Sequence, residues 1–305
     1  MKPARYRGRF APTPSGPLHF GSMVAAVGSY LDAKAHDGEW ALRIDDVDTP
    51  RVVAGSADAI VRTLEAFGLQ WDGPIAYQHS RGGAYEHALD RLRADDRLYA
   101  CTCTRREIAD AGIAGIEGPV YPGTCRNGAT AERNAPACRV RTTGIRIEFD
   151  DLLQGHVRQD LERDIGDFVV KRADGVYGYH LACAVDDGDQ HITHVVRGAD
   201  LLASTSRQIY LQRLLGLATP AYLHLPVALN ASGEKLSKQT LAQPVDAANA
   251  PAALSAVLAF LGHAPPRELR GADLDAQWKW ARAAWQRSRL PRTAPPLQIA
   301  SGAPS

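Results

Sequence analysis

The chain has 305 residues, of which 45% are hydrophobic and 23% charged, and its formal net charge is +1 at pH 7. This composition is ordinary for a globular protein, and it excludes a polycation that would hold nucleic acid through its overall charge. No stretch approaches the ~20 apolar residues of a membrane helix, and the basic N-terminus lacks the apolar run of a signal peptide. We therefore expect a cytoplasmic monomer without membrane contact.

The first predicted elements follow a turn rich in proline and glycine, with the sequence RFAPTPSGPLHFGS at positions 9–22. A helix is expected over 22–36 with Ser22 as its N-cap, and a strand over 40–44. Backbone N–H groups at such a helix start, together with His19, form a ready site for phosphate. A turn, a helix and a strand in this order predict a doubly wound α/β sheet.

The chain changes character after two further predicted helices, at 56–68 and 83–97. Three of the five cysteines, Cys101, Cys103 and Cys125, fall within 25 residues of a glycine-rich stretch. In a reducing compartment, clustered cysteines favour zinc over a disulfide, and three thiolates with a fourth ligand make a tetrahedral site. No histidine lies between the first and last of them, so the fourth ligand stays open. Plain thiols without a metal are the alternative interpretation.

The second half alternates between predicted strands, at 138–150, 167–171, 191–198 and 223–229, and a helix at 204–215. After the last strand, the sequence GEKLSKQ at positions 233–239 carries Lys235 and Lys238 on a loop that glycine initiates. Two such lysines can close on polyphosphate as point charges. Helices are then expected over 249–262 and 273–289. The second contains Trp278 and Trp285, which we expect to pack inside the protein, with RNA stacking as the alternative.

The turn at His19 and the lysine loop resemble the HIGH and KMSKS signatures of the class I aminoacyl-tRNA synthetases. The wording RFAPTPSGPLHFG is similar to the glutamyl and glutaminyl branch, and the resemblance covers roughly residues 5–240. It implies an α/β fold: a Rossmann-type parallel sheet with an inserted zinc-binding subdomain and a small helical C-terminal region. The implied division is a first catalytic half at 1–98, the insert at 99–175, a second catalytic half at 176–240, a helical domain at 241–290 and a disordered tail at 291–305.

Such enzymes join an amino-acid carboxylate to the α-phosphate of ATP and expel pyrophosphate. The carboxylate is already a nucleophile, so catalysis consists of positioning and charge neutralisation. The resemblance implies that His19, Lys235 and Lys238 are catalytic. It implies ATP and its Mg²⁺ at His19, Gly21, Ser22, Lys235 and Lys238, and L-glutamate at Arg9, Phe10, Ala11, Pro12, Thr13, Asp45, Tyr179 and Arg197. It also implies one structural zinc per chain, on Cys101, Cys103, Tyr121 and Cys125.

Two positions depart from the pattern of glutamyl enzymes. Asp45 stands in the sequence RIDDVD, where relatives usually carry glutamate, which is one methylene longer. Cys183 stands in YHLAC, where full-length glutamyl enzymes tend to have asparagine. Asp45 is the acid expected to receive the ammonium group of the substrate. The shorter Asp45 is expected to reach that group through water or a shifted backbone, and Cys183 makes an ordinary glutamyl enzyme a poorer match.

Length separates the members of this branch. Ordinary glutamyl enzymes continue past the lysine loop with a large helical region that reads the anticodon, and the 66 residues after Gln239 are too few for it. The resemblance is therefore closest to a shortened group, the glutamyl-queuosine tRNA(Asp) synthetases. It implies ATP-dependent activation of L-glutamate and its transfer to the queuosine base in the anticodon of tRNA(Asp).

Three alternatives remain open. One is a non-discriminating glutamyl-tRNA synthetase that charges the 3′ end and relies on a separate chain to read the anticodon. Another is a catalytically silent tRNA-binding paralogue, although such a module has no need of His19, Lys235 and Lys238. The third is a nucleotidyltransferase of the same superfamily, although these enzymes lack the KLSK loop and the cysteine-rich insert.

Overall fold

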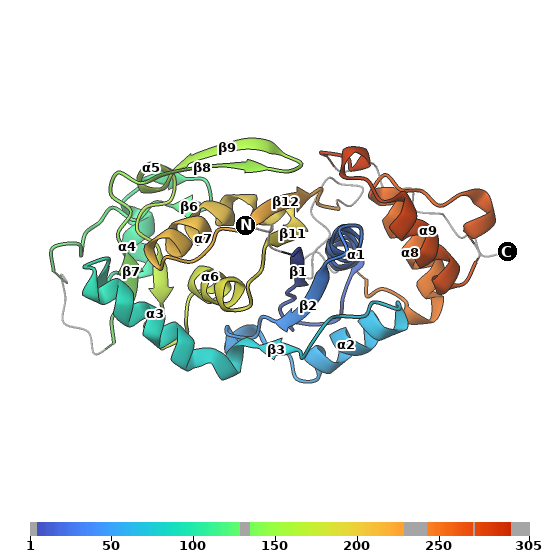
Figure 1. Cartoon of the computed structure of the whole chain (residues 1–305). Helices are drawn as coiled ribbons and strands as arrows, with labels where there is room; N and C mark the ends of the chain where they lie inside the picture. Colours follow the sequence, from blue (N-terminus) through green and yellow to red (C-terminus); the bar gives the residue numbers. More distant parts are fainter. Residues whose placement is uncertain (1–4, 129–134, 229–242, 271, 294–305) are drawn as a thin grey trace.

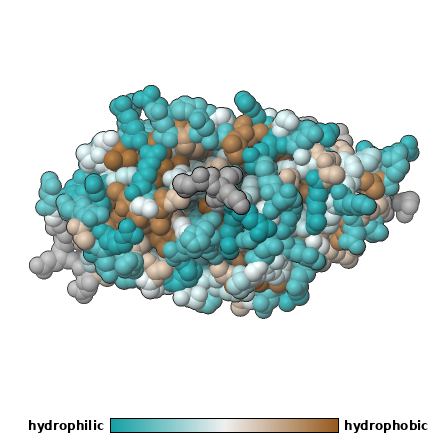
Figure 2. Space-filling view, in the orientation of Figure 1, coloured by the Kyte–Doolittle hydropathy of each residue, from teal (hydrophilic) through white to brown (hydrophobic). Residues whose placement is uncertain are grey.

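The computed structural model describes residues 5–128, 135–228, 243–270 and 272–293. The molecule is elongated: a cysteine-containing insert forms one end, two C-terminal helices form the other, and parallel strands lie between them (Figure 1). Across the described ranges, no helix is both long enough and apolar enough to cross a membrane. The viewed face is mainly hydrophilic, with hydrophobic residues gathered in patches over its middle and toward the insert (Figure 2).

The central strands form two neighbouring sheets. The first contains β1 (Arg7–Phe10), β2 (Glu39–Ile44) and β3 (Ala76–Tyr77), all parallel. The second has the order β11 (His194–Gly198), β12 (Ala221–Leu225), β8 (Arg146–Asp151) and β9 (Gly155–Asp160), with only β9 antiparallel to its neighbour. The amide of Thr193 donates to the carbonyl oxygen of Arg7 at 2.9 Å, which joins the sheets side by side. The predicted parallel α/β fold is confirmed.

In the described part of the chain, five helices surround these strands and pack buried side chains against them. They are α1 (Phe20–Lys34), α2 (Ser56–Ala66), α3 (Gly82–Ala94), α6 (Tyr179–Asp189) and α7 (Leu202–Leu214). Short 3₁₀ turns are η1 (Thr49–Arg51), η2 (Gln78–Arg81), η3 (Ala199–Leu201), η5 (Ala247–Asn249), η6 (Arg267–Leu269) and η7 (Arg287–Arg289).

The insert has a separate antiparallel sheet made of β4 (Leu98–Cys101), β7 (Ala137–Val140) and β10 (Val169–Lys171). It also contains α4 (Arg105–Asp110), α5 (Leu161–Asp164) and a small hairpin of β5 (Ala114–Gly115) and β6 (Gly118–Pro119). Strand β8 falls within the predicted range 99–175 and pairs with β12, so this part of the range extends the central sheet.

The C-terminal helices α8 (Ala250–Phe260) and α9 (Leu274–Ala284) share one hydrophobic core with α1 and the first sheet. Trp278 and Trp285 are buried, and their indole N–H groups donate to the carbonyl oxygen of Phe67 at 2.8 Å and to Asp32 at 3.2 Å. The guanidinium of Arg287 binds both carboxylate oxygens of Asp32. The prediction that the two tryptophans pack inside the protein is therefore confirmed.

Candidate active site

A cavity of about 640 Å³ opens where the parallel strands β1, β2, β11 and β12 end. The carboxyl ends of parallel strands meet at one edge of a sheet, which is where ligands of doubly wound folds bind. Every described residue to which the sequence gave a part in ATP or glutamate binding lines this cavity. They are Arg9, Phe10, Ala11, Pro12, Thr13, His19, Gly21, Ser22, Asp45, Tyr179 and Arg197.

His19 begins helix α1. Its backbone is extended, and its Nδ1 accepts a hydrogen bond from the Ser22 amide at 3.3 Å, so His19 is the N-cap. The prediction of Ser22 as N-cap is wrong, because the imidazole takes the amide that a cap must satisfy. A neutral ring that accepts at Nδ1 carries its proton on Nε2. His19 therefore has a fixed donor at a helix N-terminus that lines the cavity.

The predicted lysine loop, with Lys235 and Lys238, lies outside the described residues. Its two flanks do not. Ala228 lines the cavity, and Pro244 forms an antiparallel bridge with His19. The chain thus leaves the cavity at one flank and returns at the other beside the histidine.

Four charged side chains, two of which line the cavity, pair with one another. The Nε and Nη2 atoms of Arg9 donate to Asp187 at 3.2 and 3.4 Å, and Nη1 of Arg43 donates to the same carboxylate at 2.7 Å. Nε of Arg43 donates to Asp45 at 2.6 Å. Burial raises the pKa of Asp187, but the two guanidinium groups outweigh it and lower that pKa to about 2. The cluster is therefore held together without a ligand.

The two residues that depart from the glutamyl pattern contact each other. The Cys183 thiol lies 3.6 Å from Oδ2 of Asp45, whose other oxygen accepts from Arg43. Burial raises the pKa of Asp45, although Arg43 acts against the shift. The pairing of these two departures could not be seen in the sequence, because 138 positions separate them.

Arg197 lies on β11 and is held from two sides. Its Nε donates to Nε2 of His224 at 3.1 Å, and its Nη2 donates to Oγ1 of Thr205 at 2.8 Å. Its buried Nη1 has no partner in the described part of the chain. A buried guanidinium whose Nη1 has no partner within the described ranges, in a residue that lines a cavity, is suited to bind a carboxylate.

Sequence reasoning missed a contact between the insert and the cavity wall. Glu117, in the turn between β5 and β6, forms an ion pair with Arg207 of α7, and both residues line the cavity. Glu117 also belongs to the insert that carries the cysteines. A lone glutamate in a glycine-rich turn gives no signal for such a role.

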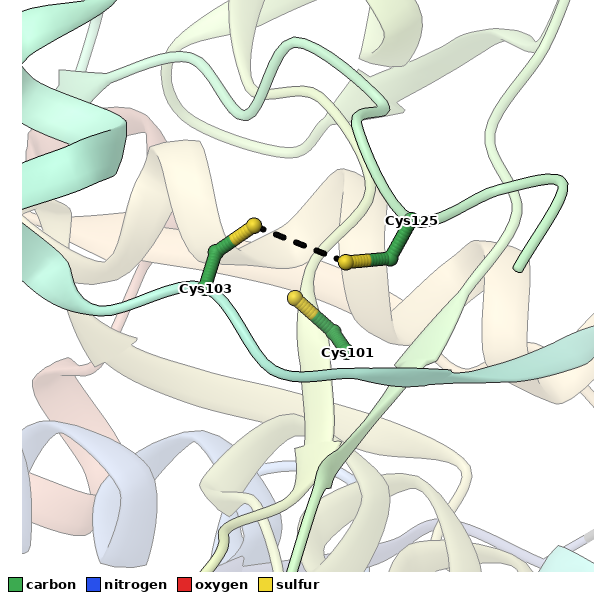
Figure 3. A group of neighbouring side chains, drawn as sticks. All are labelled: Cys101, Cys103 and Cys125. Carbon is green, nitrogen blue, oxygen red and sulfur yellow. Dashed lines mark hydrogen bonds between the residues drawn. The ribbon is translucent and has the colours of Figure 1, made fainter. Parts of the chain in front are cut away.

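The three cysteines predicted as metal ligands come together in the insert (Figure 3). The ligand atoms of Cys101, Cys103 and Cys125 all lie within 4.8 Å of one another, and the Cys103 and Cys125 sulfurs are 3.5 Å apart. The phenol oxygen of Tyr121 lies 3.4 Å from the Cys101 sulfur and 3.7 Å from the Cys103 sulfur. Burial raises the pKa of the Cys103 thiol to about 11.

Comparison with known proteins identifies the family to which the chain belongs. A family profile described as "tRNA synthetases class I (E and Q), catalytic domain" matches residues 5–264. The glutamyl-Q tRNA(Asp) synthetase of Aromatoleum aromaticum is 56% identical over 287 residues, which are 94% of this chain and 91% of the relative. The enzyme of that name from Dechloromonas aromatica is 57% identical over 94% of this chain and 96% of its own. The chain belongs to the glutamyl-Q tRNA(Asp) synthetase family.

Solved structures place this family member beside larger enzymes. A glutamate tRNA ligase from Elizabethkingia meningosepticum, crystallised with its amino acid, superposes with a TM-score of 0.75 and 26% identity. The match covers 95% of this chain and 66% of that ligase. The glutamate-tRNA synthetase of Elizabethkingia anophelis matches with the same TM-score over 67% of its length. The class I synthetase fold is thus common to this chain and to enzymes about half as long again.

Proposed function

We propose that this chain activates L-glutamate with ATP and transfers it to the queuosine base in the anticodon of tRNA(Asp). The observation that carries this proposal is the match to glutamyl-Q tRNA(Asp) synthetases at 54–57% identity over more than nine tenths of both chains. The cavity at the strand ends supports it, because it gathers basic side chains, an acid and a helix N-terminus. These groups are complementary to glutamate and to a nucleotide phosphate.

In the first step, an oxygen of the glutamate α-carboxylate bonds to the α-phosphorus of ATP, and the bond to pyrophosphate breaks. No proton has to move. His19 would donate from Nε2 to a phosphate oxygen, and the amides at the helix start near Gly21 would bind others, with Ser22 beside them on the cavity wall. Lys235 and Lys238 would neutralise the charge on the departing pyrophosphate, beside the Mg²⁺ that accompanies ATP.

Glutamate recognition follows from the charges on the cavity wall. Arg197 and Arg9 would bind carboxylate, because guanidinium groups match its two oxygens. Asp45 would receive the ammonium group, and Tyr179, the first residue of α6, would donate a hydrogen bond from its phenol O–H to glutamate. The segment from Phe10 to Thr13, after β1, would complete the pocket wall.

In the second step, a hydroxyl oxygen of the acceptor bonds to the glutamyl carbonyl carbon, the bond from that carbon to the phosphate oxygen breaks, and AMP leaves with the hydroxyl proton on its phosphate. Queuosine carries a cyclopentene diol that is similar to the ribose diol of a 3′-terminal adenosine. The same acyl-transfer geometry therefore serves both acceptors. Bases of a splayed loop are accessible to a protein in a way that paired bases are not.

The cysteine cluster supports a structural zinc ion, one per chain, in the insert at 99–175. Zinc–sulfur bonds of about 2.3 Å in a tetrahedron place two sulfurs about 3.8 Å apart. The 3.5 Å between Cys103 and Cys125, and the approach of the Tyr121 oxygen to Cys101 and Cys103, fit that geometry. Zinc would bind the thiolates and hold the insert. We propose the predicted division for the rest of the chain as well: catalytic halves at 1–98 and 176–240, a helical domain at 241–290 and a tail at 291–305.

The test compares three RNAs with labelled glutamate: tRNA(Asp) with queuosine, the same tRNA without it, and tRNA(Glu). We expect transfer to the first alone. A fourth substrate, queuosine-containing tRNA(Asp) that lacks its 3′-terminal adenosine, should accept glutamate as well as the intact RNA. Transfer to the 3′ end of tRNA(Glu) would instead support a non-discriminating glutamyl-tRNA synthetase. Absence of ATP–pyrophosphate exchange with glutamate would support a silent paralogue.

A further inference from the structure

A chain of three buried polar side chains crosses neighbouring strands behind the glutamate-facing wall. Arg197 on β11 lies opposite His224 on β12 in the parallel register, and Asp151 ends β8, which pairs with β12. His224 is fully buried, and Arg197 and Asp151 are each 4% exposed. Nothing assigned so far to ATP, glutamate or zinc uses His224 or Asp151.

The hydrogen bonds along this chain fix where the His224 proton lies. Arginine only donates, so Nε2 of His224 accepts from Arg197 at 3.1 Å. The ring proton must then be on Nδ1, which lies 2.6 Å from Oδ2 of Asp151 and donates to it. Burial lowers the pKa of His224 to about 4, although Asp151 opposes the shift. The ring is therefore neutral at physiological pH, in a single tautomer.

The other oxygen of Asp151 anchors the chain to the backbone. Oδ1 accepts from the amides of Leu153 at 3.0 Å, Gln154 at 2.8 Å and His224 at 3.2 Å. This carboxylate cannot rotate without losing several backbone hydrogen bonds. Asp151 thus sets the orientation of the imidazole, and the imidazole sets that of the Arg197 guanidinium.

We infer that Asp151 and His224 are positioning residues that aim Arg197 at the side-chain carboxylate of glutamate. Because its Nε donates to His224 and its Nη2 donates to Thr205, the Arg197 guanidinium cannot turn. Arg197 lines the cavity, and its Nη1 has no partner among the described residues. Selection of glutamate over glutamine then depends on the tautomer of a histidine that does not contact the substrate. This inference rests on the proposed function, because it takes glutamate as the ligand.

The sharpest variant is Asp151→Asn, which keeps the size of the side chain. Its amide oxygen stays on the three backbone N–H groups, so its NH₂ faces the ring and donates to Nδ1. The ring proton moves to Nε2, where it opposes the Nε–H of Arg197. We expect the KM for glutamate to rise about 10–100-fold, the scale of a lost charge-assisted hydrogen bond, and the preference for glutamate over glutamine to fall by a similar factor. The KM for ATP should change less than about threefold.

Two histidine variants and a matched control accompany it. His224→Leu should resemble Asp151→Asn, whereas His224→Gln should recover much of the glutamate binding, because its amide oxygen can accept from Arg197. His263 is another fully buried histidine, whose Nε2 accepts from the Gln286 amide at 3.1 Å in the C-terminal region. His263→Leu should lower the melting temperature as His224→Leu does, with no change in glutamate preference.

The assay is ATP–pyrophosphate exchange with glutamate or glutamine, with and without tRNA, and ¹⁵N NMR of labelled histidine reports the tautomer directly. Equal losses for glutamate, glutamine and ATP in Asp151→Asn would overturn the inference, as would a His224 proton on Nε2 in the unmodified protein. A protein that exchanges with no amino acid at all would instead refute the proposed function. The NMR result stands in either case, so the two failures are distinguishable.

Discussion

The cavity at the strand ends, called the cleft below, and the cysteine cluster differ in how the charges of their buried ionisable side chains are balanced. Beneath the cleft, Arg9 and Arg43 meet Asp187, so positive and negative groups lie in direct contact. In the insert, three thiols and the phenol of Tyr121 are gathered together, and every one of them is an acid. Arg139 lies over the Tyr121 ring at 4.0 Å from its centre, and its guanidinium donates to a backbone carbonyl.

This difference indicates which of the two regions depends on a bound ligand or metal ion for its stability. Charges that pair with each other keep their ionised forms when buried, as the low pKa of Asp187 shows. Burial raises the pKa of the Cys103 thiol to about 11, so this thiol stays protonated at neutral pH. The insert also has little apolar core around the cysteines, beyond Tyr99 and Ile108. We therefore expect the cleft to be rigid without ligands and the cluster to depend on a metal ion.

The largest effect on stability should come from breaking the paired charges. Asp187→Asn leaves the guanidinium groups of Arg9 and Arg43 without their shared anion. Breaking a buried pair costs about 3–5 kcal/mol, so we expect the free energy of unfolding to fall by that amount at pH 7. Chemical denaturation measures it. Asp90→Asn is the control, because Asp90 pairs with Arg93 at the surface with 65% of its side chain exposed, and it should cost less than about 1 kcal/mol.

The same pair predicts a pH dependence. The folded pKa of Asp187 is depressed to about 2, so its contribution to stability is fully present above its unfolded pKa, about 4. That contribution is lost as the pH falls from about 4 towards about 2. Asp187→Asn should remove this part of the acid sensitivity. An unchanged acid profile would show that other carboxylates govern acid unfolding and that the cleft is not held by this pair.

A substitution in the lysine loop should lower the rate of glutamate activation without changing the stability of the protein. Lys238→Ala removes one charge partner of the departing pyrophosphate, and we expect glutamate activation to fall by about 10²–10³. The melting temperature and the calorimetric affinity for glutamate should stay as they are. Equal losses in affinity and rate would assign Lys238 to ground-state binding instead.

A substitution in the cysteine cluster should lower the stability of the protein and leave the chemistry of the active site unchanged. Elemental analysis should find about one zinc per chain, and Cys125→Ser should lose it with a drop in melting temperature. Cys138→Ser, at a thiol outside the cluster, should keep the metal. Binding releases thiol protons, so zinc affinity should decrease as the pH falls, by up to about tenfold per pH unit for each proton released. Metal-free protein of unchanged stability would contradict this prediction.

The smallest expected effect concerns the contact between the two departures. Cys183→Ala removes one buried sulfur beside Asp45, which costs about 1 kcal/mol for the small cavity left behind. Glutamate activation should change less than about threefold, because Arg43 still holds Asp45. Exchange kinetics with glutamate measure it. A large loss would show that the thiol, rather than the arginine, positions the carboxylate.

The sequence revealed the parts of the site that lie in short segments. The turn before His19, the strand at Arg197 and the three clustered cysteines each carry a local pattern; the first two line one cavity, and the cysteine sulfurs lie within 4.8 Å of one another. Helix boundaries were less accurate: α1 begins at Phe20, because the imidazole of His19 caps it. A histidine that caps a helix leaves no mark in hydrophobic periodicity, whereas a serine in the same segment resembles an ordinary cap.

The supporting contacts could not be predicted, because they join segments far apart. His224 looks like a plain residue of an apolar strand until Asp151, 73 positions away, comes beside it. Glu117 meets Arg207 across 90 positions. Pairings of this kind depend on the register of strands and the packing of helices, which no single segment determines.

The cap at His19 has a consequence for sequence tolerance. One group that holds the imidazole is the main-chain N–H of position 22, which every amino acid except proline supplies. Side-chain changes at that position therefore leave this hydrogen bond to Nδ1 in place. Among homologues, the histidine can keep one tautomer while its helical neighbour drifts, so variation at position 22 is no sign of altered chemistry.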